Sequence, residues 1–307
     1  MGIDGGGTKT HTVIVGADGG VLEEAQDGPS NPLRIGVRQG IANIQSAAMD
    51  ALERINRTPD DIVTVFAGLA GARRDDIRMQ MQTGISSTFP RAEVIVLTDA
   101  DIALFATTQG GPGLVVISGT GSICYGTDGK GRSAVAGGWG PIAGDEGAGF
   151  YIAREALTAV AKASDGRGPA TALSDLAAEY FRAPSADDLI VAIYSPSTDH
   201  KRLAGFAEKV IEAAHEGDTV SIGILADAGR ELGLSACAVI RKLAFGKKKF
   251  PVGLVGGVFA AGDLITKPLG KKLMECAPRS SLRFPEMSPA EAAARMALEF
   301  DHQSPRR

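Results

Sequence analysis

The sequence predicts an α/β protein in which buried strands alternate with amphipathic helices. Short apolar runs rich in β-branched residues each stop at glycine or at a hydroxyl or acidic residue, over residues 13–16, 62–66, 94–97, 114–117 and 252–255. Between them, apolar residues recur at spacings of three and four, as in 37–55 and 222–240. Because α/β proteins bind ligands at the carboxyl ends of their strands, the residues that follow these runs are the first candidates for a site.

Length and composition narrow the class of protein. The chain has 307 residues, 44% of them apolar, which predicts two domains with a core each. A net charge of −4 gives no broad attraction for nucleic acid or for an anionic membrane. No apolar run reaches the length of a membrane span, and the polar, glycine-rich start does not read as a signal peptide. A cytoplasmic protein acting on a small molecule is therefore expected.

The cysteines give a prediction of their own. Cys124, Cys237 and Cys276 are widely spaced and form no Cys-x-x-Cys motif. This pattern favours reduced thiols in a reducing compartment, with neither a zinc site nor an iron–sulfur cluster.

A first glycine-rich loop follows the first strand, as Asp-Gly-Gly-Gly-Thr-Lys-Thr over residues 4–10. Glycines let backbone N–H groups approach phosphate oxygens, and Lys9 adds positive charge. The spacing fits neither the Walker motif nor the dinucleotide fingerprint, and a plain hairpin loop would also explain the glycines. Asp4 argues against that alternative, because a carboxylate here suits a phosphate site only if a divalent cation lies between them.

A second loop, Ser-Gly-Thr-Gly-Ser over residues 118–122, follows the run 114–117. Asp128-Gly129 predicts the turn of a hairpin here as well. Two hairpins with glycine and hydroxyl loops could hold a polyphosphate from both sides. Two ordinary tight turns are the alternative.

Two carboxylates follow the run 94–97. Asp99 and Asp101 could take the proton from a hydroxyl that attacks a phosphoryl group. The alternative is an aspartate that caps a helix over 102–107, and this carries more weight for Asp101 than for Asp99.

The only tryptophan, Trp139, is surrounded by glycines in Gly-Gly-Trp-Gly over 137–140, and Asp145 and Glu146 follow soon after. An indole face and nearby carboxylates in an open loop suit the C–H face and hydroxyls of a sugar. The alternatives are a core tryptophan, and acids that only favour the start of a helix at Gly147.

Nine short motifs occur in one order along the chain: residues 4–10, Ser-Asn (30–31), Ala-Gly-Leu-Ala-Gly (67–71), Thr-Asp-Ala (98–100), 118–122, 137–140, Gly-Asp-Glu-Gly (144–147), Ala-Gly-Arg-Glu-Leu-Gly (228–233) and Val-Gly-Gly-Val (255–258). Together they resemble the BadF/BadG/BcrA/BcrD ATPase family, and within it the N-acetylglucosamine kinases. The resemblance implies two ribonuclease-H-like, actin-like ATPase domains with a nucleotide cleft between them. It places the first domain at 1–106 plus 288–307, where Ser-Pro-Ala-Glu (288–291) predicts a closing helix over 289–300. The second domain is expected at 107–287 with a helical insertion, and the protein as a homodimer.

The resemblance also assigns roles. ATP phosphates are expected on two groups of residues, which are Gly6, Gly7, Thr8 and Lys9 in the first loop and Gly119, Thr120 and Gly121 in the second. Adenosine is expected near Gly229, Gly256 and Gly257. Asp4 resembles the acid that holds Mg²⁺ through water, and Asp99 the catalytic base. Sugar contacts are expected at Asn31, Trp139 and Asp145, with Ser118, Gly138 and Glu146 close by.

The expected activity is phosphorylation of an amino sugar by ATP, with N-acetylglucosamine at O6 favoured and glucosamine or N-acetylmuramate as alternatives. Ile123 stands where animal N-acetylglucosamine kinases have asparagine, and Pro32 and Leu33 follow Asn31 in place of the family's usual residues. These departures leave the acyl group of the sugar open. A rival from another class is the family's iron–sulfur activator ATPase, which needs paired cysteines in a glycine-rich context, and the cysteines here do not resemble that arrangement.

Overall fold

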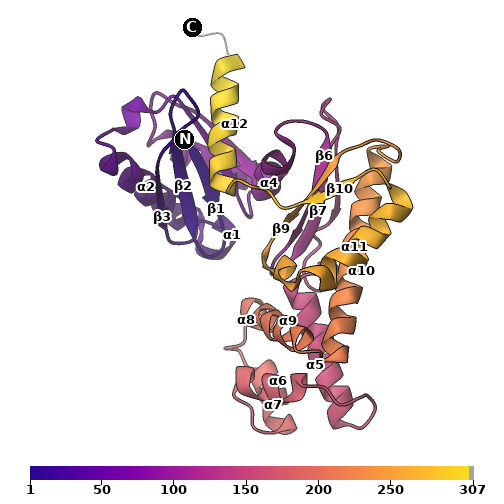
Figure 1. Cartoon of the computed structure of the whole chain (residues 1–307). Helices are drawn as coiled ribbons and strands as arrows, with labels where there is room; N and C mark the ends of the chain where they lie inside the picture. Colours follow the sequence, from indigo (N-terminus) through magenta and orange to yellow (C-terminus); the bar gives the residue numbers. More distant parts are fainter. Residues whose placement is uncertain (304–307) are drawn as a thin grey trace. The chain divides into compact units, whose positions relative to one another are not determined.

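The computed structural model describes residues 1–303, and residues 304–307 lie outside the described part. The chain forms two compact units, one of residues 1–110 with the C-terminal segment from Pro285, the other of residues 111–284. Each unit contains one five-stranded sheet (Figure 1).

The sheet of the first unit has the strand order β3-β2-β1-β4-β5. Its strands are β1 (Gly2–Gly5), β2 (Thr10–Val15), β3 (Val21–Asp27), β4 (Thr64–Leu69) and β5 (Glu93–Thr98). The strands β1, β2 and β3 form an antiparallel meander, whereas β1, β4 and β5 run parallel to one another. The carboxyl ends of β1, β4 and β5 therefore share one edge.

Helices cover both faces of this sheet. They are α1 (Pro32–Ile35), α2 (Val37–Arg54), α3 (Asp75–Ser86), α4 (Asp99–Thr108) and α12 (Pro289–Gln303), with a 3₁₀ turn, η1, at Pro59–Asp61. The helices α2 and α3 pack on one face around Ile44, Leu52 and Met81, and α4 and α12 pack with strand residues in a separate core. The helix α12 lies so close to β1 that a Cβ on Gly2 would fall 2.1 Å from the backbone nitrogen of Ala294.

The sheet of the second unit repeats this connectivity in the order β10-β9-β6-β7-β8. Its strands are β6 (Gly113–Ser118), β7 (Ser122–Thr127), β8 (Ser133–Gly137), β9 (Pro251–Val255) and β10 (Ser281–Arg283). Again the first three strands form an antiparallel meander, and the later two run parallel to the first. The hairpin β6–β7 thus holds the same place in its sheet as β1–β2 holds in the first.

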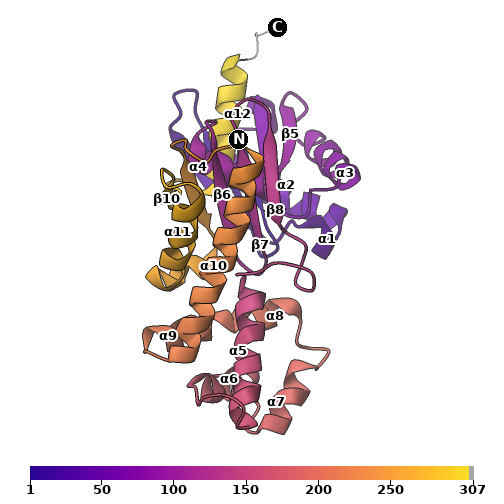
Figure 2. The same cartoon turned by 90° about the vertical axis from the view of Figure 1, so that its right-hand side faces the viewer.

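The helices of the second unit fall into two groups (Figure 2). The long helix α10 (Thr219–Lys242) and α11 (Asp263–Cys276), with a 3₁₀ turn, η2, at Gly257–Ala261, pack beside each other. The second group lies in the segment 148–216. Its helices are α5 (Gly149–Ser164), α6 (Leu173–Phe181), α7 (Ala186–Ile193), α8 (His200–Gly205) and α9 (Ala207–His215).

Most predicted elements are present, and their ends differ by a few residues. The closing helix runs to Gln303, beyond the expected range 289–300, and Ser288 caps it through a 3.1 Å hydrogen bond from the N–H of Glu291. The helix predicted over 102–107 begins earlier, at Asp99, because Thr98 rather than an aspartate caps it. In residues 1–303, no helix is both long and apolar enough to cross a membrane.

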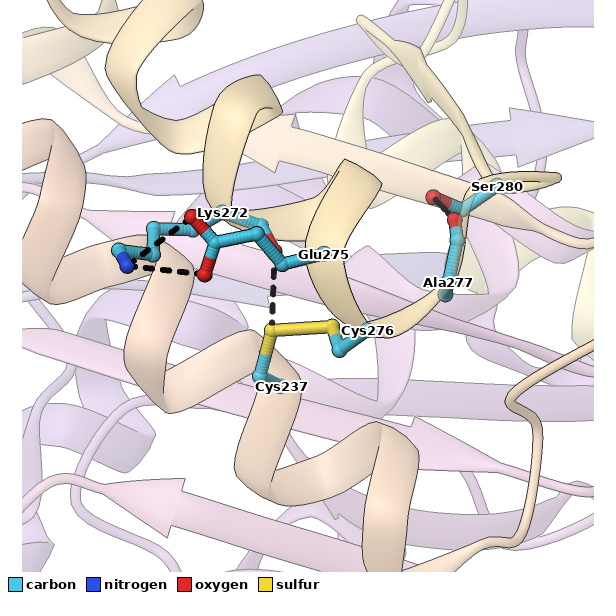
Figure 3. Close-up of a disulfide and its surroundings, with 6 residues drawn as sticks. All are labelled: Cys237, Lys272, Glu275, Cys276, Ala277 and Ser280. Atoms are coloured by element: carbon cyan, nitrogen blue, oxygen red, sulfur yellow. Dashed lines mark hydrogen bonds and ion pairs between the residues drawn. A yellow bond between two sulfur atoms is a disulfide. The ribbon is translucent and has the colours of Figure 1, made fainter.

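The prediction of reduced thiols is wrong for two of the three cysteines. Cys237 on α10 and Cys276 at the end of α11 form a disulfide (Figure 3). They are 39 residues apart in sequence, but the packing of α10 on α11 brings their Cα atoms within 6.0 Å. Cys-spacing rules search for local pairs, so they miss a bond that tertiary packing creates. Cys124 is buried and free.

Candidate functional site

The first glycine loop connects β1 to β2. Backbone hydrogen bonds hold it, one within the loop and two from residues 30–31. The N–H of Gly6 donates to the carbonyl of Lys9 at 2.9 Å. The carbonyl of Gly6 accepts from the N–H groups of Ser30 and Asn31 at 3.0 and 3.1 Å. The predicted phosphate loop and the predicted sugar contact Asn31 are therefore held side by side. Asn31 itself caps α1, since its Oδ1 accepts from the N–H of Leu33 at 3.0 Å.

A second cation lies at this loop besides Lys9, which the motif suggests. Thr8 and Lys9 are exposed, and the ammonium of Lys9 donates to Gln26 at 3.3 Å. Arg34 on α1 lies over Gly7, where an added Cβ would fall 3.2 Å from a guanidinium nitrogen. Within residues 1–303 this guanidinium has no hydrogen-bond or ion-pair partner. Sequence reasoning missed Arg34, and the only signal for it is its position three residues after Asn31.

Asp4 and Asp99 lie at the same edge of the first sheet. Asp4 is next to the last residue of β1, and Asp99 directly follows β5, with β4 between them. Asp4 also shares a face with Gly2, which contacts α12, so it lies on the side of the sheet that α4 and α12 cover. Burial, and next the charge of Asp99, raise the pKa of Asp4 to about 6. The two carboxylates thus interact across β4.

The structure separates the roles of Asp99 and Asp101. Asp101 closes a capping box, because its Oδ2 accepts from the N–H of Thr98 at 3.0 Å and from its hydroxyl at 2.6 Å. Asp99 is the first residue of α4 and is exposed. Surrounding protein desolvates its carboxylate and raises its pKa, while N–H groups at the helix start, including that of Ala100 at 3.0 Å, act in the opposite direction. Asp99 is therefore the carboxylate left available for chemistry.

The second glycine loop connects β6 to β7 and is tied to the start of α5. Gly119 donates to the carbonyl of Gly121 at 2.9 Å, and its own carbonyl accepts from the N–H of Gly149 at 2.8 Å. Thr120 is exposed at the tip, with its carbonyl 3.3 Å from the N–H of Phe150. The hydroxyl of Thr120 is thus presented to solvent by a loop whose backbone is held on one side by a helix.

Glycine is required where the loop after β9 meets this one. Gly256 has φ +115°, and an added Cβ would fall 2.1 Å from the carbonyl oxygen of Ser118. The parallel pairing of Ile117 with Val255 explains the approach, since both strands end at this edge. Gly257 has open space around its Cβ position. Gly229 is different: it is buried in α10, where an added Cβ would fall 2.3 Å from the carbonyl oxygen of Ile265 on α11.

The predicted sugar residues of this unit lie on the segment between β8 and α5. Trp139 is exposed, as an open loop requires, with 78% of its surface accessible. Gly138 has φ +72° and packs against Ile123, the residue that departs from the family pattern. Asp145 has left-handed backbone, with φ +56°, and is only 8% exposed. Glu146 is half-buried.

The serines that flank the second loop bond to that same segment. The buried hydroxyl of Ser118 donates to the carbonyl of Gly147 at 2.9 Å, and that of Ser122 donates to the carbonyl of Glu146 at 2.8 Å. Ser118 was predicted close to the sugar, and its hydroxyl is used inside the protein. Ser122 was not singled out, because a serine at the end of a glycine loop gives no sign of a partner 24 residues away.

The surroundings of Asp4 fit a cation that is bound by one carboxylate together with substrate phosphates and water. Over residues 1–303 there is no cluster of three His, Cys, Asp or Glu side chains that could hold a metal ion. Mg²⁺ is commonly held by one or two carboxylates together with substrate phosphates and water, and does not need such a cluster. A partly buried carboxylate with a raised pKa, beside a glycine loop, suits that mode of binding.

Two sheets of equal connectivity, each with a glycine loop at the first hairpin, define the class of actin-like ATPase folds that includes sugar kinases. A solved structure of a proposed N-acetylglucosamine kinase from Chromobacterium violaceum shares this fold, with a TM-score of 0.77 over 97% of each chain and 24% identity. The chain belongs to the BadF/BadG/BcrA/BcrD ATPase family, whose sequence model matches residues 1–297.

Curated relatives narrow the comparison. An N-acetylmuramic acid/N-acetylglucosamine kinase of Clostridium acetobutylicum is 39% identical over 259 residues, which are 84% of each chain. An N-acetyl-D-glucosamine kinase of Dictyostelium discoideum is 32% identical over 309 aligned positions, which cover 97% of each chain.

Proposed function

We propose that this protein transfers the γ-phosphoryl group of ATP to the 6-hydroxyl of N-acetylglucosamine. The observation that carries the proposal is the repeated hairpin: β1–β2 and β6–β7 hold the same place in their sheets, and each presents a glycine loop with a hydroxyl residue. Membership of an ATPase family and the names of the two curated relatives support an amino sugar as the acceptor.

In the proposed reaction, the sugar hydroxyl oxygen attacks the γ-phosphorus while the bond to the leaving ADP oxygen breaks. The hydroxyl proton passes to the carboxylate of Asp99, which must therefore be ionised beforehand. Lys9 and Thr120 contribute positive charge and a hydroxyl donor to the transferring group. Bound Mg²⁺ would supply charge neutralisation at the phosphates, and Asp4 would hold it through water.

The sugar itself is proposed to contact Asn31, Trp139 and Asp145. The alternatives are glucosamine and N-acetylmuramate. The name of the Clostridium relative supports N-acetylmuramate as an alternative, because it includes N-acetylmuramic acid beside N-acetylglucosamine. The iron–sulfur activator is not proposed, since Cys124 is buried and Cys237 and Cys276 are bonded to each other. We also propose a homodimer in the cytoplasm, and light scattering at several concentrations tests the oligomer.

A coupled assay of ADP release across N-acetylglucosamine, glucosamine, N-acetylmuramate and glucose tests the substrate. We expect the highest kcat/KM for N-acetylglucosamine, and phosphorus NMR of the product should place the phosphate on O6. If glucosamine or N-acetylmuramate gave the higher kcat/KM, the kinase would stand and the sugar assignment would be wrong. If no sugar were phosphorylated, the proposed function itself would fail.

A further inference from the structure

The segment that carries Asp145 is bent in an unusual way. Between residues 137 and 147, Asp145 and four glycines have positive φ, the glycines being Gly137, Gly138, Gly140 and Gly147. Left-handed backbone is ordinary for glycine but less favourable for an aspartate. Such conformations persist where the surrounding structure holds them, and they gather at functional sites. The contacts that hold Asp145 therefore indicate what it does.

Two buried serine hydroxyls hold the backbone directly after Asp145. Ser122 donates to the carbonyl of Glu146 and Ser118 to the carbonyl of Gly147, at 2.8 and 2.9 Å. Both serines belong to the hairpin that carries the second glycine loop, one at each end of that loop. The two hydrogen bonds fix the segment to the loop at neighbouring peptide units.

The side chain of Asp145 also contacts the second glycine loop, through its carboxylate. It lies against Gly121, where an added Cβ would fall 2.5 Å from its Oδ2. The backbone amides of Ser122 and Gly140 both interact with it. One side chain thus contacts the second glycine loop and the end of the loop 137–140. Since Asp145 is only 8% exposed, most of its surface serves these internal contacts.

We propose that Asp145, in addition to the sugar contact proposed above, joins the loop 137–140 to the second glycine loop, so that sugar binding and nucleotide binding are coupled. The inference rests on the proposed function, because it assigns the first loop to the sugar and the second to ATP phosphates. Ser118 and Ser122 act through Asp145 by holding the two peptide units that follow it. A ligand that orders one loop then lowers the cost of ordering the other, and the effect is reciprocal.

The coupling can be measured without turnover, as the dissociation constant of ADP with and without saturating N-acetylglucosamine. In the wild type we expect the two constants to differ about 5-fold or more, the usual lower range for coupled sites. Ser122→Ala should bring the ratio below about 2, while ADP alone binds within about 2-fold of wild type. Ser122→Thr restores the hydroxyl and should restore the ratio. Ser118→Ala is the second variant, in case the first does not fold.

Ser280→Ala is the matched control. Its hydroxyl also donates to a backbone carbonyl, that of Ala277 at 2.8 Å, but far along the chain near β10 (Figure 3). The control should lose some thermal stability and keep the wild-type ratio. A wild-type ratio of 1, or an unchanged ratio in both Ser122→Ala and Ser118→Ala, would overturn the coupling proposal. Absence of ADP or sugar binding in the wild type would instead refute the proposed function.

Discussion

Asp101 and Thr98 cap the helix α4 reciprocally: the carboxylate accepts from the N–H of Thr98 at 3.0 Å, and the N–H of Asp101 donates to the Thr98 hydroxyl at 3.3 Å. This box satisfies the N–H groups of Thr98 and Asp101, whereas the carboxylate of Asp99 accepts from the N–H of Ala100 at 3.0 Å. Of the two aspartates that follow β5, one therefore supports the fold and the other is available to a substrate.

The first prediction separates these two roles. Asp99→Asn keeps the size of the side chain and loses the proton acceptor, so we expect kcat to fall at least about 10²-fold while ADP binding changes little. Asp101→Asn should keep kcat within a few-fold and lower the free energy of unfolding by about 1 kcal/mol. Steady-state kinetics, calorimetry and thermal unfolding of both variants provide the measurement. If Asp101→Asn proved the more damaging to kcat, the base has been misassigned.

The second prediction concerns Arg34, whose guanidinium lies over Gly7 without a partner in the described chain. Guanidinium binds phosphate with paired N–H donors, so Arg34→Gln should weaken ADP binding about 3- to 10-fold. Arg38→Gln, in the next helix and also exposed, is the control and should bind ADP as the wild type does. Equal affinity in all three proteins would show that Arg34 is only a solvated surface residue.

The third prediction follows from the raised pKa of Asp4. Its pKa is about 6 in the folded protein against 3.8 ordinarily. Above pH 6 the folded protein therefore holds an ionised carboxylate that burial disfavours, which lowers the free energy of unfolding. This group therefore makes the protein more stable as the pH falls from about 6 to about 4. Asp4→Asn removes that cost, and we expect it to raise the free energy of unfolding by about 1–2 kcal/mol at pH 8.

Denaturant unfolding in EDTA, at pH 8 and pH 4, tests this. The advantage of Asp4→Asn should shrink at pH 4, where the wild-type carboxyl is largely protonated. An advantage that is equal at both pH values would point to packing instead of charge. The variant should also lose most of its kinase activity, which would fit the role proposed for Asp4 at Mg²⁺.

The sequence predicted the hairpin loops well because each depends on local chemistry. The residues 4–10 and 118–122 combine a strand end with glycines, and the Asp-Gly pair at 128–129 is typical of a hairpin turn. The sequence favoured a capping role for Asp101 over Asp99, but both suit a helix start, and only the atomic contacts with Thr98 show that Asp101 closes the capping box. It also could not find Ser122, Arg34 or the disulfide, because each depends on residues that folding brings together.

The fourth prediction concerns the disulfide between Cys237 and Cys276. A bond that closes a loop of about 39 residues is expected to stabilise by up to about 4 kcal/mol, through the entropy of the unfolded chain. Protein purified without reductant should show one reactive thiol per chain under denaturing conditions, that of Cys124, and three after reduction. Cys276→Ser should lower the unfolding temperature and show two thiols, those of Cys124 and Cys237, both before and after reduction. Three thiols before reduction would contradict the bond.

The last prediction uses two neighbouring glycines that the structure treats differently. Gly256→Ala would place a Cβ 2.1 Å from the carbonyl oxygen of Ser118, at a φ of +115° that side chains rarely adopt. We expect a loss of about 3 kcal/mol or more in the free energy of unfolding, whatever ligand is bound. Gly257→Ala meets nothing within 4 Å and begins the turn η2, so its stability should stay within about 1 kcal/mol of wild type.

Gly257→Ala therefore tests nucleotide binding without a large change in stability. If adenosine binds at this turn, the added methyl group should weaken ADP binding about 5-fold or more in a protein of normal stability. Calorimetry with ADP and, in parallel, with inorganic pyrophosphate separates the contribution of the adenosine from that of the phosphates. Adenosine contact predicts that ADP binding weakens while pyrophosphate binding is kept, because the glycine loops that hold phosphates are untouched. Wild-type affinity for ADP would mean that the adenosine site does not include Gly257.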